Sequence, residues 1–137
     1  MKRVMGIDIG QKRIGIAVSD LLGMTAQGIE TYERKGESDA AYMVNKAKQL
    51  GADTIVAGLP LNMNGSEGPS ALMAREFMEQ IKGLGMNIAF QDERLTTVSA
   101  ERTLIEADMS REKRRKVIDK LAAVYILETY MSIHPVR

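Results

Sequence analysis

The sequence predicts an α/β fold, in which a mixed five-stranded sheet carries helices on both of its faces. The first 34 residues contain three strand-like segments separated only by short turns, which favours an antiparallel meander. After residue 38, apolar stripes with helical spacing alternate with short apolar runs, which favours parallel strands joined through helices by right-handed crossovers. The length of 137 residues suits one domain, and we expect it to span residues 1–137.

The meander is predicted from short segments at the start of the chain. Residues 4–9 form a buried strand, residues 10–13 a tight turn, and residues 14–19 a second strand whose branched apolar side chains share one face. Residues 25–34 form a weaker third strand, because Gly28 interrupts the pattern. These three strands supply the antiparallel part of the sheet.

Helices and strands alternate in the rest of the chain. Four helices are predicted, at residues 38–50, 70–82, 96–107 and 117–133, and two strands, at residues 54–59 and 87–91. Gly51 stops the first helix, and Thr96 or Thr97 can cap the third. We expect residues 60–69 to form a loop and Ser110 to open a short basic segment before the last helix.

Composition narrows the classes of protein that fit. The chain has no cysteine, so we expect neither a disulfide nor a thiolate metal site. No apolar run approaches the roughly 20 residues that span a bilayer, and no secretory leader is evident, so we expect a cytoplasmic protein. Residues 111–116, REKRRK, carry a net charge of +4 in a chain whose net charge is +1. Positive charge is therefore concentrated in one segment.

An acid interrupts the first apolar strand. Val4, Gly6 and Asp8 share one face, because side chains alternate along a strand. An unpaired buried carboxylate costs free energy, so Asp8 needs cations, hydrogen-bond donors or the open end of the strand. Gly10 lets the chain turn sharply and lets a ligand approach the backbone. A carboxylate that merely caps the turn is the alternative.

Further acids come from two other elements. Asp92 and Glu93 follow the last strand, and alternation lets only one of them face the side of Asp8. Asp119 shares a helix face with Ala122 and Ala123, whose small side chains let the helix lie close to the sheet and bring Asp119 near the first strand. A contact with the helix dipole is the alternative for Asp119.

Carboxylates on three separate elements predict a metal site. With no cysteine and one histidine near the C-terminus, they form a set of hard oxygen ligands that suits Mg²⁺ or Mn²⁺. Two such ions about 4 Å apart can activate water and stabilise the leaving oxygen in phosphodiester hydrolysis. The acids therefore indicate a metal-dependent nuclease.

Four segments together resemble the YqgF/RuvX family, whose members are described as Holliday junction resolvases and as nucleases that mature the small-subunit ribosomal RNA precursor. They are GIDIGQKRIGIAVSD at 6–20, IVAGLPLNMNGSEG at 55–68, DERLTT at 92–97 and DKLAA at 119–123. The resemblance covers essentially the whole chain. It implies an RNase H-like fold, which agrees with the predicted order of elements.

The resemblance also implies roles for individual residues. Asp8, Glu93 and Asp119 match the catalytic acids that bind metal, and water is then activated by the metals rather than by a side chain. Related junction resolvases carry a second carboxylate one turn from the helix acid, where this chain has Lys116 and Ala122. Asp20 or Asp92 are candidates to compensate, and the sequence does not choose between them.

Basic residues near these acids are expected to contact nucleic acid. They are Lys12, Arg13, Arg94, Arg111, Lys113, Arg114, Arg115 and Lys116. Binding through them would weaken steeply with salt. The loop at 60–69 supplies amides, with Asn62, Asn64 and Ser66, next to a helix N-terminus where a nucleic-acid backbone could bind. An ordinary connection is the alternative for this loop.

The predicted function is hydrolysis of structured nucleic acid, and the favoured reaction is maturation of the 5′ end of the 16S ribosomal RNA precursor. Resolution of four-way DNA junctions is the alternative, and it requires a two-fold dimer. No dimer seam is evident, so both a monomer and a homodimer stay open. A phosphotransferase is a third hypothesis, since actin-like ATPases and sugar kinases share the first hairpin but close two such domains. A binding module that has lost catalysis is the fourth.

Overall fold

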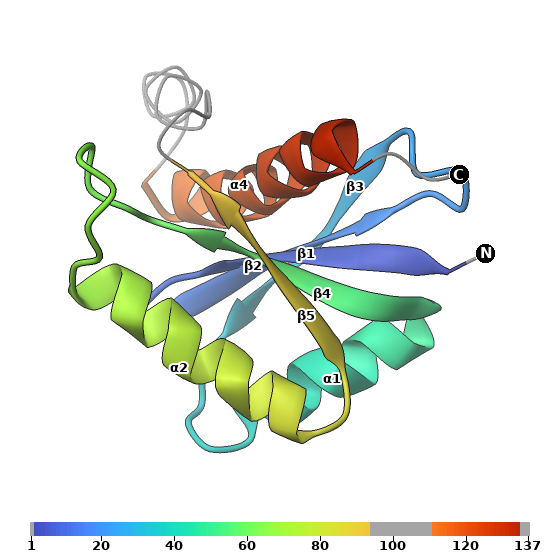
Figure 1. Ribbon diagram of the computed structural model, residues 1–137. Coiled ribbons are helices and arrows are strands. Elements are labelled where there is room, and N and C mark those ends of the chain that lie inside the picture. Colours follow the sequence, from blue (N-terminus) through green and yellow to red (C-terminus); the bar gives the residue numbers. More distant parts are fainter. Residues whose placement is uncertain (1, 94–110, 135–137) are drawn as a thin grey trace.

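The computed structural model describes residues 2–93 and 111–134, with the side chains of the last helix described from Val117 onward. These residues contain a five-stranded sheet in the order β3-β2-β1-β4-β5 (Figure 1). The strands are β1 Arg3–Ile9, β2 Arg13–Ser19, β3 Ala26–Glu33, β4 Ala52–Leu59 and β5 Asn87–Asp92. The helices are α1 Asp39–Gln49, α2 Pro69–Gly83 and α4 Arg111–Ile133.

The sheet is mixed, as the sequence predicts. β1, β2 and β3 form an antiparallel meander, whereas β4 pairs in parallel with β1 and β5 pairs in parallel with β4. The connections from β3 to β4 and from β4 to β5 each pass through a helix, α1 and α2. Both α1 and α2 cover one face of the sheet, and α4 crosses the other (Figure 1).

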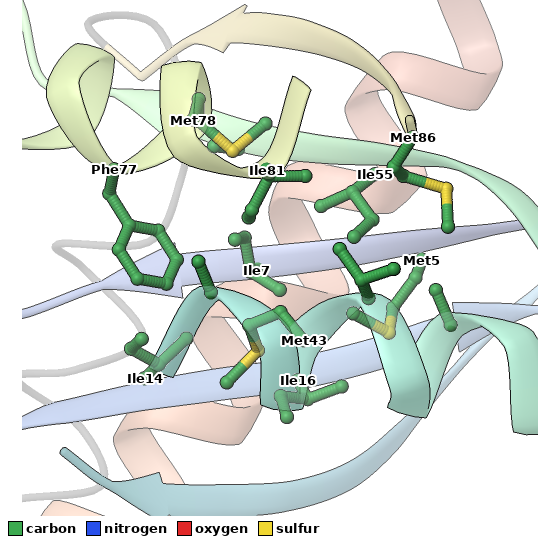
Figure 2. Packing of buried hydrophobic residues seen from close by; sticks show 14 of the residues in the cluster. Met5, Ile7, Ile14, Ile16, Met43, Ile55, Phe77, Met78, Ile81 and Met86 are labelled. Atoms are coloured by element: carbon green, nitrogen blue, oxygen red, sulfur yellow. The ribbon is translucent and has the colours of Figure 1, made fainter. Parts of the chain in front are cut away.

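The two faces of the sheet differ in the size of their side chains. The face toward α1 and α2 carries the large apolar core, which Figure 2 shows at close range. Ile7 and Ile14 from the sheet are fully buried there against Phe77 and Ile81 of α2. The face toward α4 instead carries glycine and alanine along β1 and β2, so this helix lies closer to the strands.

Local signals explain where the helices begin and end. α1 follows Ser38, and the chain leaves it through Gly51, whose φ of +76° disfavours a side chain. α2 begins at Pro69, whose fixed φ and missing amide hydrogen suit the first turn of a helix. None of the described helices is long and apolar enough to cross a membrane.

The structure corrects one predicted boundary. The last helix begins at Arg111 rather than at residue 117, so the segment REKRRK is helical and continues into the apolar part of α4. Lysine, arginine and glutamate are good helix formers, which explains why the basic segment extends the helix instead of preceding it. The predicted helix at 96–107, its cap at Thr96 or Thr97 and the predicted start at Ser110 lie outside the described residues.

Candidate active site

Asp8 lies near the end of β1 and faces α4. Side chains alternate along the strand, and Gly6, two residues earlier, packs directly against this helix. A Cβ at Gly6 would lie 2.9 Å from the Leu127 Cβ and 3.2 Å from the Ala123 carbonyl oxygen. Asp8 is therefore on the α4 face, as alternation predicts, and its side chain is partly buried.

Gly15 determines how closely α4 approaches Asp8. It is the residue of β2 that pairs with Asp8, and a Cβ there would collide with the backbone carbonyl of Asp119. Ala122 and Ala123 are 1% and 0% exposed, so their small side chains let the helix rest on the sheet at this point. Asp119 is thereby placed beside the strand pair that carries Asp8, which agrees with the prediction made from the alanine face.

The carboxylate of Asp119 forms an ion pair with a residue of the β1–β2 hairpin, which also carries Asp8. The Arg13 Nε donates a hydrogen bond to Asp119 Oδ2 at 2.9 Å, and the two side chains are 22% and 19% exposed. Sequence analysis placed Arg13 among the nucleic-acid contacts and did not predict this ion pair. The pair links the start of β2 to the turn of α4 that carries Asp119.

Glu93 reaches the α4 face from the far side of β4. Its backbone amide donates to the Leu59 carbonyl at 3.2 Å, and a Cβ at Gly58 would lie 2.6 Å from the Glu93 Cδ. The Glu93 side chain therefore lies over Gly58 on the same face as α4. Asp92 pairs in register with Leu59, a residue of the core under α2, and so faces the opposite side of the sheet.

These placements bring the three acids to one end of one face. Ile7 of β1 pairs with Ala57 of β4, and the next residues along these strands are Asp8 and Gly58. Glu93, which lies over Gly58, is therefore one strand away from Asp8. Asp119 lies on the opposite side of Asp8 from Glu93. In Figure 1 the strands β1, β4 and β5 end at the side of the molecule where α4 begins. Within the described parts of the chain, no three acid or histidine side chains are already close enough together to hold a metal ion.

Asp20 is separated from this end of the sheet. Its carboxylate accepts a hydrogen bond from the Met24 amide at 2.8 Å, which closes the turn between β2 and β3. The amide hydrogen bonds from Met24 and Thr25 lower the pKa of Asp20. Because β2 runs antiparallel to β1, this turn lies at the opposite end of β1 from Asp8. Asp20 is therefore far from Asp8 along the sheet, and Asp92 lies on the α2 face, away from Asp119.

A buried acid that sequence analysis missed holds the turn after Asp8. Asp39 is 1% exposed, and it accepts hydrogen bonds from the Tyr32 hydroxyl at 2.8 Å, the Lys35 amide at 2.9 Å and the Arg34 Nε at 3.2 Å. Burial alone would raise the pKa of Asp39, but these donors lower it below its ordinary value. Arg34 also donates to the Gly10 carbonyl at 2.9 Å, so Asp39 and Arg34 together fix the turn between β1 and β2.

The loop after β4 is organised by its own side chains. The Asn62 amide nitrogen donates to the Ser66 hydroxyl at 2.9 Å, and the Ser66 backbone amide donates to Asn64 Oδ1 at 2.9 Å. Beyond it, the Arg75 guanidinium of α2 bonds Glu67 at 2.6 Å. Asn62, Asn64 and Ser66, which we predicted to lie near a nucleic-acid backbone, are therefore hydrogen-bonded to one another and stabilise the loop.

Comparison with known proteins identifies the family. A family model named RuvX, described as a Holliday junction resolvase, matches residues 2–133. The chain belongs to the RuvX family. A Clostridium perfringens protein provisionally named a pre-16S rRNA nuclease is 52% identical over 131 residues, which cover 94% of this chain and 96% of the relative. Relatives from Clostridioides difficile and Syntrophomonas wolfei carry the same provisional name at 51% and 50% identity, each covered over 93% of its length. The RuvX assignment makes this chain a nuclease, a hydrolase of phosphodiester bonds.

Solved structures share the RuvX chain's fold at low sequence identity. Thermus thermophilus RuvC in complex with a Holliday junction substrate matches with a TM-score of 0.58 at 13% identity, over 98% of this chain and 95% of that one. A second T. thermophilus RuvC structure matches with a TM-score of 0.53 at 14% identity, over 96% of each chain. This likeness confirms the RNase H-like fold class that the sequence predicts.

Of the basic residues predicted to contact nucleic acid, Lys12 and Arg13 have described side chains, and both follow Asp8 closely in the sequence. Lys12 is exposed in the turn that follows Asp8, and Arg13 pairs with Asp119. The backbone of residues 111–116 forms the beginning of α4, which continues directly into the turn that carries Asp119. Arg94 lies outside the described residues.

Proposed function

We propose that this RuvX-family chain is an endonuclease that depends on Mg²⁺ or Mn²⁺ and cleaves structured nucleic acid. The observation that supports the proposal is that Asp8, Glu93 and Asp119, from three separate parts of the chain, lie toward one end of the α4 face. Glycines make this placement possible, because side chains at Gly15 and Gly58 would collide with Asp119 and Glu93.

The donor set supports the choice of metal. Asp8, Glu93 and Asp119 offer carboxylate oxygens alone, which suit Mg²⁺ and Mn²⁺ better than Zn²⁺. Gly58 leaves space for the Glu93 carboxyl group, and Gly15 leaves space for the backbone of the helix turn that carries Asp119. These three residues would hold the metal, and the family resemblance assigns them the same role.

The chain's residues then divide the work of catalysis. When bound, the divalent cations would supply an activated water and stabilise the leaving oxygen. Asp8 lies on β1 and Asp119 on α4, whereas Glu93 directly follows β5 and its backbone amide is hydrogen-bonded to Leu59 of β4. Regular structure therefore supports the backbone of each acid. Lys12 and Arg13, with Arg94, Arg111, Lys113, Arg114, Arg115 and Lys116, would bind phosphates and orient the backbone of the substrate.

The proposed substrate is the 5′ end of the 16S ribosomal RNA precursor. The provisional names of relatives at 50–52% identity support this choice. The proposal treats residues 1–137 as a single nuclease domain that acts in the cytoplasm, where ribosomal precursors are processed. It requires no second subunit, since one cut needs one site.

A four-way DNA junction is the second candidate. The description of the RuvX family and the likeness to RuvC favour it. Symmetric cutting of two strands would require a homodimer with two sites related by a two-fold axis. The oligomeric state therefore separates the two candidates as well as the substrate does.

Cleavage assays with both substrates test the proposal. Labelled ribosomal RNA precursor ends and four-way DNA junctions are incubated with the protein in Mg²⁺, Mn²⁺ or EDTA. Asp8→Asn, Glu93→Gln and Asp119→Asn should each lower the metal-dependent rate by about two orders of magnitude or more. Asp20→Asn is the matched control, because an asparagine can keep the turn cap and this turn is far from the site.

The outcomes separate the candidates. Cutting of the RNA alone by a monomer supports precursor maturation, whereas paired cuts in the junction by a dimer support resolution. Cleavage that survives EDTA, or that all three acid variants retain, would refute a metal-dependent site at these acids.

A further inference from the structure

Arg13 occupies the carboxylate that the proposed site assigns to metal. Its Nε lies 2.9 Å from Asp119 Oδ2, and both side chains are about a fifth exposed, at 22% and 19%. A cation that binds Asp119 would share the carboxylate with a guanidinium, and two positive groups on one carboxylate repel each other. The Arg13 guanidinium and a bound metal ion would therefore compete for the Asp119 carboxylate.

We propose that Arg13 is the counter-ion that Asp119 exchanges for a divalent cation. The inference rests on the proposed metal-dependent function and deepens it. In the absence of metal, Asp8, Glu93 and Asp119 concentrate negative charge at one end of the sheet, and the guanidinium offsets part of it. Metal takes over that role when it binds, and the ion pair opens.

The surrounding structure lets the side chain move while the backbone stays in place. The Arg13 carbonyl accepts a hydrogen bond from the Gly10 amide at 2.9 Å, and in the backbone register of the sheet Arg13 lies opposite Glu33 of β3. The backbone of Asp119 is held against Gly15. Opening the pair therefore requires only that a partly exposed arginine side chain rotate toward solvent.

The exchange couples metal binding to nucleic-acid binding. Once released, the guanidinium lies at the beginning of β2 next to Lys12, where it can bind a phosphate of the substrate. Metal therefore strengthens nucleic-acid binding through Arg13, and nucleic acid strengthens metal binding by the same factor.

Metal titration without nucleic acid tests the exchange separately from cleavage. Calorimetry with Mn²⁺ is compared for wild type, Arg13→Gln, Lys12→Gln and Asp119→Asn. Arg13→Gln should bind Mn²⁺ about three- to tenfold more tightly, because the competing ion pair is gone. Lys12→Gln removes the same charge one residue away and should change the affinity by less than about twofold, since exposed charges are screened. In an Asp119→Asn background, Arg13→Gln should give no further gain.

A measurement on the wild-type protein covers the case in which Arg13→Gln folds poorly. The Nε–H resonance of Arg13, followed by NMR, should exchange slowly with water without metal and faster as Mg²⁺ is added. Equal or weaker Mn²⁺ binding by a folded Arg13→Gln, or a resonance that stays protected in saturating Mg²⁺, would overturn the exchange while leaving the nuclease proposal intact. Absence of Asp8-dependent metal binding in wild type would overturn both.

Discussion

Replacement of Gly15 by alanine tests the close packing that positions the site. Gly15 lies opposite Asp8 in β2, and a Cβ there would collide with the Asp119 carbonyl and come within 3.1 Å of the Lys120 amide nitrogen. These are helix backbone atoms, so no rotamer change relieves the collision. The turn of α4 that contains Asp119 and Lys120 must move away from the sheet.

The expected cost is large for a single methyl group. Overpacking typically costs about 1–3 kcal/mol when side chains can adjust, and we expect Gly15→Ala to reach about 3 kcal/mol because the backbone must move. Gly28→Ala is the matched control on the same face under the same helix, where a Cβ would lie 3.5 Å from the Lys120 Cβ. That is ordinary contact, so the control should stay within about 0.5 kcal/mol of wild type.

Urea denaturation measures the free energy of unfolding of both variants. Cleavage is then compared without urea, at a temperature where each variant is folded. Gly15→Ala should lose cleavage activity even where it is folded, because Asp119 is displaced, and Gly28→Ala should retain it. If the two variants unfold at similar urea concentrations, α4 is not held against β2 as tightly as the glycine contacts indicate, and the reasoning fails.

Other substitutions separate stability from function. Gly58→Ala meets only the ends of flexible side chains, including the Glu93 carboxyl group, so it should cost about 1 kcal/mol of stability but lower Mn²⁺ affinity, measured by calorimetry, about tenfold. Asp39→Asn should lower the free energy of unfolding by about 2–3 kcal/mol at pH 7, because buried donors lose a charged acceptor. Since the folded pKa of Asp39 is lowered, this stabilisation is present above the unfolded pKa of about 4 and lost as the pH falls through the folded value, so urea unfolding should show the gap to wild type narrowing below pH 4. Arg34→Gln frees the Gly10 carbonyl and should slow cleavage in a single-turnover assay as well as lower stability by about 1–2 kcal/mol.

Most of the fold follows from local patterns in the sequence. Short turns between strand-like segments predict the meander, and short apolar runs between helical stripes predict the two parallel strands. Gly51 marks the end of α1 as predicted. The predicted start of α4 was wrong, because a run of charged residues has no apolar periodicity although its helix propensity is high. Periodicity therefore locates packed segments well and exposed helical extensions poorly.

The positions of the candidate site residues were predictable where they depend on alternation and not where they depend on distant contacts. Alternation correctly separates Glu93, over Gly58, from Asp92 on the other face. The Arg13–Asp119 pair joins residues 106 positions apart, and no local pattern announces it. Asp39 was overlooked because an acid at the start of a helix is common on the surface, and only the tertiary structure shows that Tyr32 and the following loop bury it.

The two faces of the sheet divide stability from chemistry. The α1 and α2 face buries large side chains such as Ile7 and Phe77, so truncation there removes apolar contacts and should cost stability first. On the α4 face, the glycines of the strands have no apolar side chain to lose, and their role is to let the helix backbone and the Glu93 carboxyl group approach the sheet. Enlarging a residue such as Gly15 or Gly58 on this face therefore displaces an acid directly. Substitutions on the α1 and α2 face therefore act first on stability, whereas enlarging Gly15 or Gly58 on the α4 face acts on the position of Asp119 or Glu93.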